Sequence, residues 1–117
     1  GAFNRDGGRQ AMLELIDRPD FEQIEVVVVA SDIMALGASA TLYAAGITPG
    51  VDVALASFDD IPGARDLHPP LTSVGLPLEE AGQRAVEAVC AADHNTAFPT
   101  RTVLSGTVVL RESTPSR

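Results

Sequence analysis

Two short runs of consecutive apolar residues restrict the fold of this chain more than any other feature. The first is EVVVVA at residues 25–30, and the second is VALASF at residues 53–58. The first run does not alternate apolar with polar residues, as a strand with one solvated face would. A continuous β-branched run is typical of a parallel strand that helices cover on both faces. The sequence therefore predicts an α/β fold around a parallel sheet, with residues 25–30 buried on both faces.

The segment between the two runs has the pattern of a helix at residues 33–45, with Gly46 as the C′ residue that ends it. Strand, helix and strand in this order form a right-handed βαβ unit with parallel strands. Near the start of the chain, Asn4 is a suitable N-cap for another helix. Gly7 and Gly8 either weaken its first turn or let another backbone come close. Helices are predicted at residues 3–18, 33–45 and 78–92, strands at residues 25–30, 53–58, 71–74 and 102–110, and a loop at residues 93–100.

The composition limits what the chain can do by itself. Its 117 residues, 45% hydrophobic and 21% charged, suit one soluble globular domain. The net charge is −8, and the eight basic residues are all arginine and are scattered, so we expect no binding to DNA or to an anionic membrane. The absence of lysine excludes P-loops, Schiff-base enzymes and kinase-type sites. With one cysteine, no internal disulfide can form, which suits a reducing compartment.

The start of the chain shows no targeting segment. It lacks the basic stretch and the apolar stretch of a signal peptide, and no apolar run approaches the roughly eighteen residues of a membrane span. It also begins abruptly before a helical pattern. We therefore expect a piece of a longer protein, without a membrane segment of its own.

Polar residues follow both apolar runs where the strands end. Ser31 and Asp32 come after the first run, and Asp59 and Asp60 after the second. In open parallel sheets, ligands bind outside the carboxyl ends of the strands, which lie on one edge. These four side chains are therefore expected to cluster there. Hydroxyl groups of a sugar could bond the adjacent carboxylates, whose mutual repulsion is unfavourable without a partner.

Each of these residues also has a simpler interpretation. Ser31 or Asp32 could cap the following helix without contacting a ligand. Asp59 and Asp60 could belong to an ordinary turn. Phe3 could stack on a sugar ring or base, or could form a hydrophobic staple with the first helical turn.

Metal binding and catalysis have little support in the sequence. His68 and His94 are far apart, and Cys90 shares only a four-residue spacing with His94, so we expect no metal site and a buried, inert Cys90. No Gly-x-Ser-x-Gly elbow is present. As sequence neighbours, Asp59 and Asp60 are poorly placed to act on one substrate from opposite sides. We therefore predict no catalysis and no cofactor.

Six motifs in order resemble the LacI/GalR family of transcriptional regulators over nearly the whole chain. AFNRDGGRQAMLELI is similar to the family's aromatic residue and Gly-containing helix, and VVASDIMALGA to its ANDxMALGA motif. AAGITPGVDVALASFDDI resembles GxxVPxDVSVVGFDD, and HPPLTSV resembles PPLTTV. EEAGQRAVEAV resembles the MGxxAVxxL helix, and VLRES resembles the closing strand.

The resemblance implies one three-layer lobe of a two-lobed, periplasmic-binding-protein-like (type I) effector domain. Residues 1–77 and 104–117 would form the C-terminal lobe, and residues 78–103 would belong to the other lobe. It also implies an effector site and a dimer surface. By this resemblance, Phe3, Ser31, Asp59 and Leu78 would bind the ligand, together with Asp32 from the strand-end argument, and Leu36 and Leu67 would form the dimer contact. Ser31 in place of Asn, and Ser57 in place of Gly, depart from the family pattern.

These observations predict the effector-binding and dimerising part of a cytoplasmic LacI-type regulator. The effector is expected to be a sugar, the assembly a homodimer, and DNA to be bound only through an N-terminal segment that this sequence does not include. Two alternatives stay open: a periplasmic sugar receptor of the same fold, and a small α/β enzyme that uses Asp59 or Asp60.

The helix at residues 78–92 raises a separate question, because its apolar residues fall on one face. In a family member, that face would pack on the lobe that is missing here. We therefore expect the helix to fold back on its own lobe, to pair with a second copy, or to lose its order.

Overall fold

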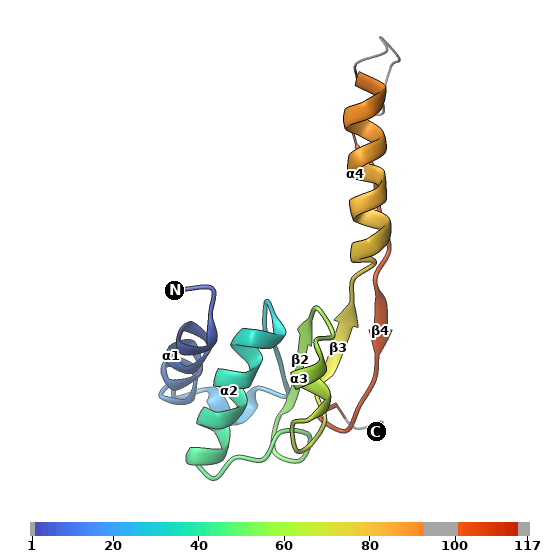
Figure 1. Cartoon of the computed structure of the whole chain (residues 1–117). Helices are drawn as coiled ribbons and strands as arrows, with labels where there is room; N and C mark the ends of the chain where they lie inside the picture. Colours follow the sequence, from blue (N-terminus) through green and yellow to red (C-terminus); the bar gives the residue numbers. More distant parts are fainter. Residues whose placement is uncertain (1, 93–100, 115–117) are drawn as a thin grey trace.

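The computed structural model describes residues 2–92 and 101–114, and it confirms an α/β fold around a mainly parallel sheet (Figure 1). The sheet has the order β1-β2-β3-β4, in which the first three strands are parallel and β4 is antiparallel to β3. The elements are α1 (Arg5–Ile16), the 3-10 helix η1 (Phe21–Gln23), β1 (Val26–Val28), α2 (Asp32–Ala44), β2 (Ala54–Phe58), α3 (Pro62–Arg65), β3 (Thr72–Gly75), α4 (Leu78–Ala92) and β4 (Thr107–Val109).

The first strand is more exposed than predicted. Among the described residues, β1 pairs only with β2, so it lies at the edge of the sheet. Val26 and Val28 are 53% and 63% exposed, whereas the alternate side chains of Val27 and Val29 pack toward the core. The prediction that residues 25–30 are buried on both faces is wrong. Burial of the second face needs another layer, and the described residues do not supply one.

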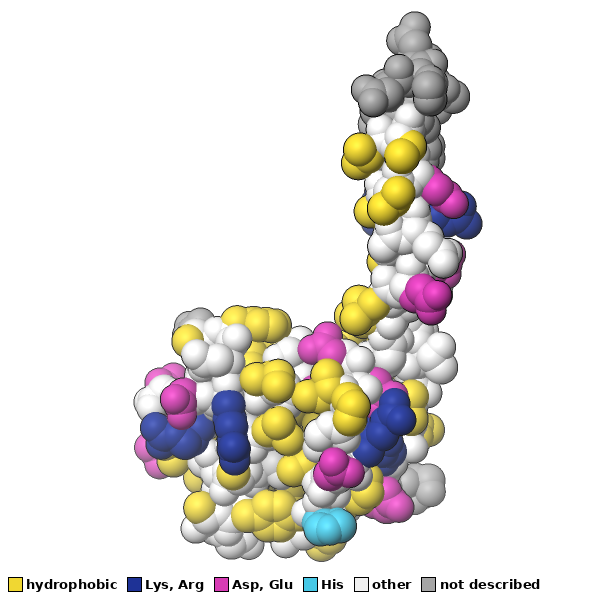
Figure 2. Space-filling view, viewed as in Figure 1, with side chains coloured by type: hydrophobic (Ala, Val, Ile, Leu, Met, Phe, Trp, Pro, Cys, Tyr) yellow, Lys and Arg dark blue, Asp and Glu magenta, His cyan; other side chains and the backbone are white. Residues whose placement is uncertain are grey.

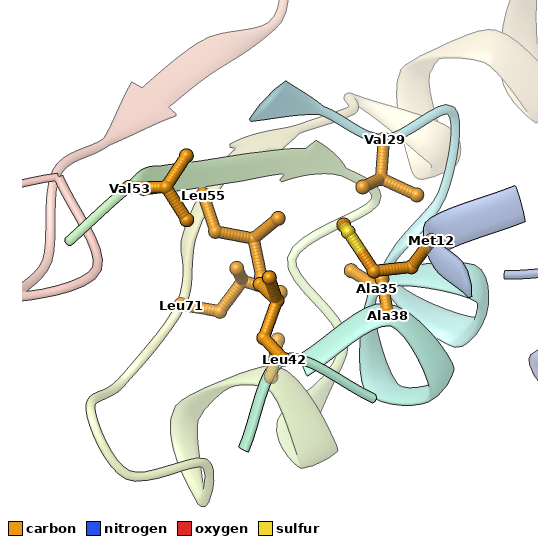
Figure 3. Packing of buried hydrophobic residues seen from close by; sticks show 9 residues of the cluster. Met12, Val29, Ala35, Ala38, Leu42, Val53, Leu55 and Leu71 are labelled. Atoms are coloured by element: carbon orange, nitrogen blue, oxygen red, sulfur yellow. The ribbon is translucent and has the colours of Figure 1, made fainter. Parts of the chain in front are cut away.

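The core lies between the sheet and the helices. Leu42 from α2, Leu55 from β2 and Leu71, just before β3, converge there and are completely buried (Figure 3). Burying a side chain of this kind contributes about 1.5–3 kcal/mol. Because side chains two residues apart share one face of a strand, Ser57 and Ser73 continue the same inner face toward the strand ends. The interior therefore changes from leucines to hydroxyls as β2 and β3 approach their carboxyl ends.

Helices α1 and α2 cross at glycines. A Cβ atom added to Gly8 would lie 2.0 Å from the carbonyl oxygen of Met34, and one added to Gly37 would lie 2.0 Å from that of Arg5. Only residues without a side chain allow the two backbones to approach so closely. Of the two expectations for Gly7 and Gly8, the structure shows the close approach of another backbone.

Two predicted helix ends are also confirmed, the N-cap Asn4 and the C′ residue Gly46, although α1 is shorter than the predicted helix at residues 3–18. The Asn4 side chain accepts a hydrogen bond from the Gly7 N–H at 2.8 Å, which caps α1. Gly46 has a φ of 76° after the C-cap of α2, and the N–H groups of Gly46 and Ile47 donate to Tyr43 and Leu42. This pair of bonds is the Schellman motif, which satisfies the last carbonyls of the helix.

Helix α4 spans the predicted residues, but it extends away from the rest of the chain instead of folding back on it (Figure 1). The radius of gyration is 17.8 Å, against about 13 Å for a compact chain of this length. Val86 and Val89 on α4 are 64% and 73% exposed. Cys90 is also exposed, so the prediction of a buried cysteine is wrong. Burial of Cys90 would require another part of the protein to pack against α4.

The last predicted strand is shorter than expected, because β4 covers three residues of the segment 102–110. The predicted loop at residues 93–100 and His94 lie outside the described residues. The division into two lobes at residues 77 and 104 stays a prediction.

Candidate ligand-binding site

The carboxyl ends of the parallel strands form the candidate site. After β1 the chain enters α2 through Ser31 and Asp32, and after β2 it turns through Asp59 and Asp60. The backbone N–H of Ile61 donates to Asp32 Oδ2 at 2.8 Å, so the two segments touch as predicted. In Figure 1 the strand ends, the start of the chain and the start of α4 lie along the same side of the lobe.

Asp32 lies inside this junction and has no exposed surface. Its Oδ1 accepts hydrogen bonds from the hydroxyls of Ser57 and Ser73, the latter at 2.8 Å, while its Oδ2 accepts the Ile61 N–H. All of its partners come from the protein itself. The expectation that Asp32 binds the ligand is therefore corrected: this carboxylate joins α2 to the ends of β2 and β3, and it has no surface left to offer.

Ser31 acts as a helix cap. It is the N-cap of α2, its Oγ accepts a hydrogen bond from the Met34 N–H at 3.4 Å, and it is 3% exposed. The capping interpretation of Ser31 is thus confirmed. Its role in ligand binding stays a prediction, with little surface available in this structure.

The loop after β2 has an unusual backbone. Asp59 and Asp60 have φ values of 109° and 52°, the region that favours glycine. Each such residue costs about 1–3 kcal/mol and persists only where its surroundings hold it in place. The surroundings do so here, because the N–H of Asp59 donates to the Val74 carbonyl at 2.9 Å and that of Asp60 to Ser73 Oγ at 3.0 Å.

The two aspartates have different surroundings. Asp60 Oδ1 pairs with Arg111 at 2.5 Å, and Oδ2 pairs with Arg65 at 2.8 Å. The hydrogen bond from Arg111 is the main reason why the pKa of Asp60 is lowered. The half-buried Asp59, in contrast, has no side-chain partner within the described part of the chain. Its carboxylate is therefore free to accept hydrogen bonds from a ligand.

Phe3 and Leu78 are both open to solvent, with exposed fractions of 72% and 68%. The staple interpretation of Phe3 requires an apolar partner at the fourth helical position, which is Gly8. Phe3 therefore projects from the start of α1 without that contact. Both residues stay predictions as ligand contacts.

Leu36 and Leu67 are half-buried on the surface formed by α2 and α3. Ile33 and Tyr43 on α2 are 44% and 42% exposed, and hydrophobic side chains gather over this part of the lobe in Figure 2. The Tyr43 hydroxyl also bonds the His68 carbonyl, which ties α2 to the loop that carries Leu67. The surface suits the predicted dimer contact, which stays untested.

Other site types find no support in the described residues. No group of three or more metal-ligating side chains occurs among residues 2–92 and 101–114. No helix in this part of the chain has the length and apolar character needed to cross a membrane.

Sequence reasoning missed the groups that hold the site together. Ser73 and Arg111 do not resemble a site when read alone, and Arg111 is 51 residues from Asp60. The usable signal was the pair of adjacent carboxylates, since their repulsion calls for nearby cations. The sequence did not show which arginines supply them.

A family model of the periplasmic binding protein-like domain matches residues 1–114. The chain is 39% identical over 115 residues to the HTH-type transcriptional regulator CelR of Thermobifida fusca. This alignment covers 97% of the chain and 33% of the relative, so the chain spans about a third of the length of that protein.

Solved structures of transcriptional regulators have the same fold. A complex of the transcriptional regulator CelR with cellobiose matches with a TM-score of 0.84 and 40% identity, over 97% of this chain and 34% of that one. A lac repressor dimer bound to operator and the anti-inducer ONPF matches with a TM-score of 0.86 and 25% identity, over 99% and 40% of the respective chains. These relatives are regulators rather than enzymes, in agreement with the expected absence of catalysis.

Proposed function

Because this chain belongs to the family of periplasmic binding protein-like domains, in the form found in LacI/GalR transcriptional regulators, we propose that it contributes to the effector site of such a regulator and that its effector is a sugar. The regulator as a whole binds DNA through parts outside this chain and acts in the cytoplasm. The chain contributes one side of the effector site and a surface for a homodimer around Leu36 and Leu67.

One observation carries the proposal: at the carboxyl ends of the parallel strands, the Asp59 carboxylate has no side-chain partner among residues 2–92 and 101–114. A carboxylate in this position accepts hydrogen bonds from two neighbouring sugar hydroxyls. Bonds of this charge-assisted kind contribute about 1.5–3 kcal/mol each. An anionic effector is disfavoured, because Arg65 and Arg111 are already paired with the neighbouring Asp60.

Phe3 and Leu78 supply the apolar part of the proposed site. A sugar ring has one face made mainly of C–H groups, and an exposed aromatic ring can cover such a face. Phe3 is free to do so because it makes no staple with α1. Leu78 lies at the start of α4, on the same side of the lobe as the strand ends (Figure 1).

Isothermal titration calorimetry on the full-length regulator tests the proposal. The panel consists of mono- and disaccharides and includes cellobiose, the ligand of the related CelR complex. For the sugar that the wild type binds best, Asp59→Ala is expected to weaken binding about tenfold or more, which is about 1.4 kcal/mol or more. Phe3→Ala should weaken the binding of the same sugar. It should leave the fold intact, because Phe3 is exposed.

Asp20→Ala is the matched control. Asp20 is an exposed aspartate paired with Arg18 at 2.7 Å, and it belongs to the turn after α1. Its loss should leave sugar affinity unchanged. Equal affinity of the wild type and Asp59→Ala would exclude Asp59 from the site, and a wild type that binds no sugar in the panel would exclude a sugar effector of those classes.

A further inference from the structure

We propose that Asp60, Ser73 and Arg111 are positioning residues, which hold the loop at residues 59–61 in the backbone conformation that keeps the Asp59 carboxylate free for the ligand. The inference rests on the proposed role of Asp59 in effector binding. It assigns a task to three side chains that do not themselves face the ligand.

Every backbone N–H of this loop has its own acceptor. The N–H of Asp59 donates to the Val74 carbonyl, that of Asp60 to Ser73 Oγ and that of Ile61 to Asp32 Oδ2. Ser73 also donates its hydroxyl proton to Asp32 Oδ1 at 2.8 Å. The loop is thus attached to β3 and α2 at three consecutive positions.

These attachments explain how two aspartates stay in a glycine-like conformation. The φ values of 109° at Asp59 and 52° at Asp60 are unfavourable for residues with a Cβ atom. Strain of this kind persists only where the surroundings over-determine the backbone, and it is found at ligand sites. Without the acceptor on Ser73, the loop would relax toward a more common conformation and move the Asp59 side chain.

The Asp60 carboxylate contributes in a second way, by engaging the nearby arginines. Arg111 donates from Nη2 to Asp60 Oδ1 at 2.5 Å and from Nη1 to the Leu71 carbonyl at 2.6 Å. Its backbone N–H donates to Thr72 Oγ1 at 2.8 Å, so the residue is held at both ends. Its side chain and that of Asp60 are each 13% exposed. A guanidinium that is fixed in this way is unable to swing to Asp59 and neutralise it.

Arg65 is the weaker of the two cationic partners. It pairs with Asp60 Oδ2 at 2.8 Å, but its side chain is 59% exposed, and exposed ion pairs contribute little. Arg65 therefore serves as an internal comparison for Arg111. We therefore assign the positioning role to Arg111. Replacement of Arg65 should have only a small effect on sugar affinity.

A double-mutant cycle on the full-length regulator tests the inference, with calorimetry on the best-binding sugar of the panel. Asp60→Asn keeps the shape of the side chain and removes the charge that engages Arg111. In the wild-type background it should weaken binding about fivefold to tenfold, because the preorganisation of Asp59 is lost. In the Asp59→Asn background it should change the affinity by less than about twofold, since the contact it positions is already absent. A merely structural role would lower affinity equally in both backgrounds.

Ser73→Ala, Arg65→Ala and Asp20→Asn complete the design. Ser73→Ala removes the acceptor of the Asp60 N–H and should behave like Asp60→Asn, so the inference can be tested even if one of the two variants fails to fold. Arg65→Ala and Asp20→Asn should bind as the wild type does. Urea unfolding verifies that each variant is folded under the conditions of the titration.

The outcomes separate the two proposals. The positioning role is overturned if Asp59→Asn weakens sugar binding but Asp60→Asn and Ser73→Ala do not. It is also overturned if the effects of these two variants on affinity simply add to that of Asp59→Asn. In both cases the proposed function stands. If Asp59→Asn binds as the wild type does, the role of Asp59 fails and the positioning inference fails with it.

Discussion

Asp59 and Asp60 show how two identical neighbours acquire different tasks. The Asp60 carboxylate pairs with Arg111 and Arg65, so its charge is matched inside the protein, and its backbone N–H donates to Ser73 Oγ. Asp59 is held through its backbone N–H, and its side chain has no partner in the part of the chain that the structure describes. The repulsion between the two charges is therefore offset at Asp60, and the second carboxylate stays available for a ligand.

The ion pairs of Asp60 predict a dependence of stability on pH. The hydrogen bond from Arg111 lowers the pKa of Asp60 below that of an unfolded aspartate, which is about 3.9. The ionised carboxylate therefore stabilises the folded state fully above the unfolded pKa, and this contribution is lost as the pH falls through the lower folded pKa. Between about pH 5 and 8, the free energy of unfolding of the wild type should exceed that of Asp60→Asn by a constant amount. Below about pH 4 this difference in free energy should decrease.

Urea unfolding followed by circular dichroism, at a series of pH values from 7 to about 2, measures this gap. The comparison removes the contribution of the other acids, because both proteins share them. If the difference in the free energy of unfolding between the two proteins stays constant down to the most acidic pH, the ion pairs of Asp60 do not stabilise the folded state.

The pairing of α1 with α2 depends on two glycines rather than on large side chains. Gly8 and Gly37 bring each helix against the backbone of the other. Together the two helices cover one face of the sheet and carry Met12 and Leu42 into the core. The position of Ser31 and Asp32 at the start of α2 follows from this packing, as does their contact with the ends of the neighbouring strands.

Replacement of Gly37 by Ala tests the close approach. Alanine favours a helix over glycine by about 1 kcal/mol, but the new Cβ would lie 2.0 Å from the Arg5 carbonyl oxygen and 2.9 Å from the Arg9 nitrogen. The two helices would have to separate, so we expect a net loss of about 1–3 kcal/mol in the free energy of unfolding. Urea unfolding is the measurement.

Gly82→Ala is the matched control in α4, because a Cβ atom there meets nothing within 4 Å. It should leave stability unchanged or raise it by up to about 1 kcal/mol. If Gly37→Ala stabilised the protein as much as Gly82→Ala does, the contact between the two helices would not be as close as described.

Besides the outer face of β1, two more apolar surfaces lie uncovered by the described residues. One is the surface of α2 and α3 around Leu36 and Leu67, and the other is the exposed side of α4 with Val86 and Val89. Apolar surfaces of this kind are typical of contacts with other proteins or domains. On a chain with extents of 59 × 29 × 23 Å, we expect these surfaces to disfavour an isolated monomer.

We predict that the 117-residue chain forms a symmetric dimer through Leu36 and Leu67. Leu36→Arg places a charge in this contact and should produce monomers, whereas Val89→Arg on α4 should leave the dimer intact. Static light scattering at tens of micromolar protein measures the mass. A wild type that is monomeric would contradict the prediction, and a dimer that survives Leu36→Arg but not Val89→Arg would show that α4 is the contact.

The charge of the molecule leads to one more expectation. With 16 acidic and eight basic residues, the chain should not bind operator DNA by itself at physiological salt, because DNA binding depends on clustered cations. An electrophoretic mobility shift assay with the operator of the full-length regulator tests this. A sequence-specific shift by the 117-residue chain would contradict the expectation, and the full-length protein serves as the positive control.

Local patterns in the sequence were enough to predict the parallel pairing of β1 with β2 and, to within two residues, the limits of α1, α2 and α4, but not the antiparallel pairing of β4 or the short helix α3. Asn4 and Gly46 mark helix ends because capping depends on a few neighbouring residues. The clustering of polar residues at the strand ends was also predictable, since parallel strands end at one edge. The partners of Asp59 and Asp60 were not, because they lie far away along the chain.

Three features depended on contacts between distant segments. The pairing of Asp60 with Arg111 joins residues 51 positions apart, and no local pattern encodes it. The burial of Asp32 requires hydroxyls from two strands that meet only after folding. The exposure of β1 and α4 depends on which layers are present to cover them, whereas an apolar pattern reports only that a face could be buried. Periodicity and capping therefore place the elements, while long-range hydrogen bonds and packing determine which of two adjacent carboxylates is left for a ligand.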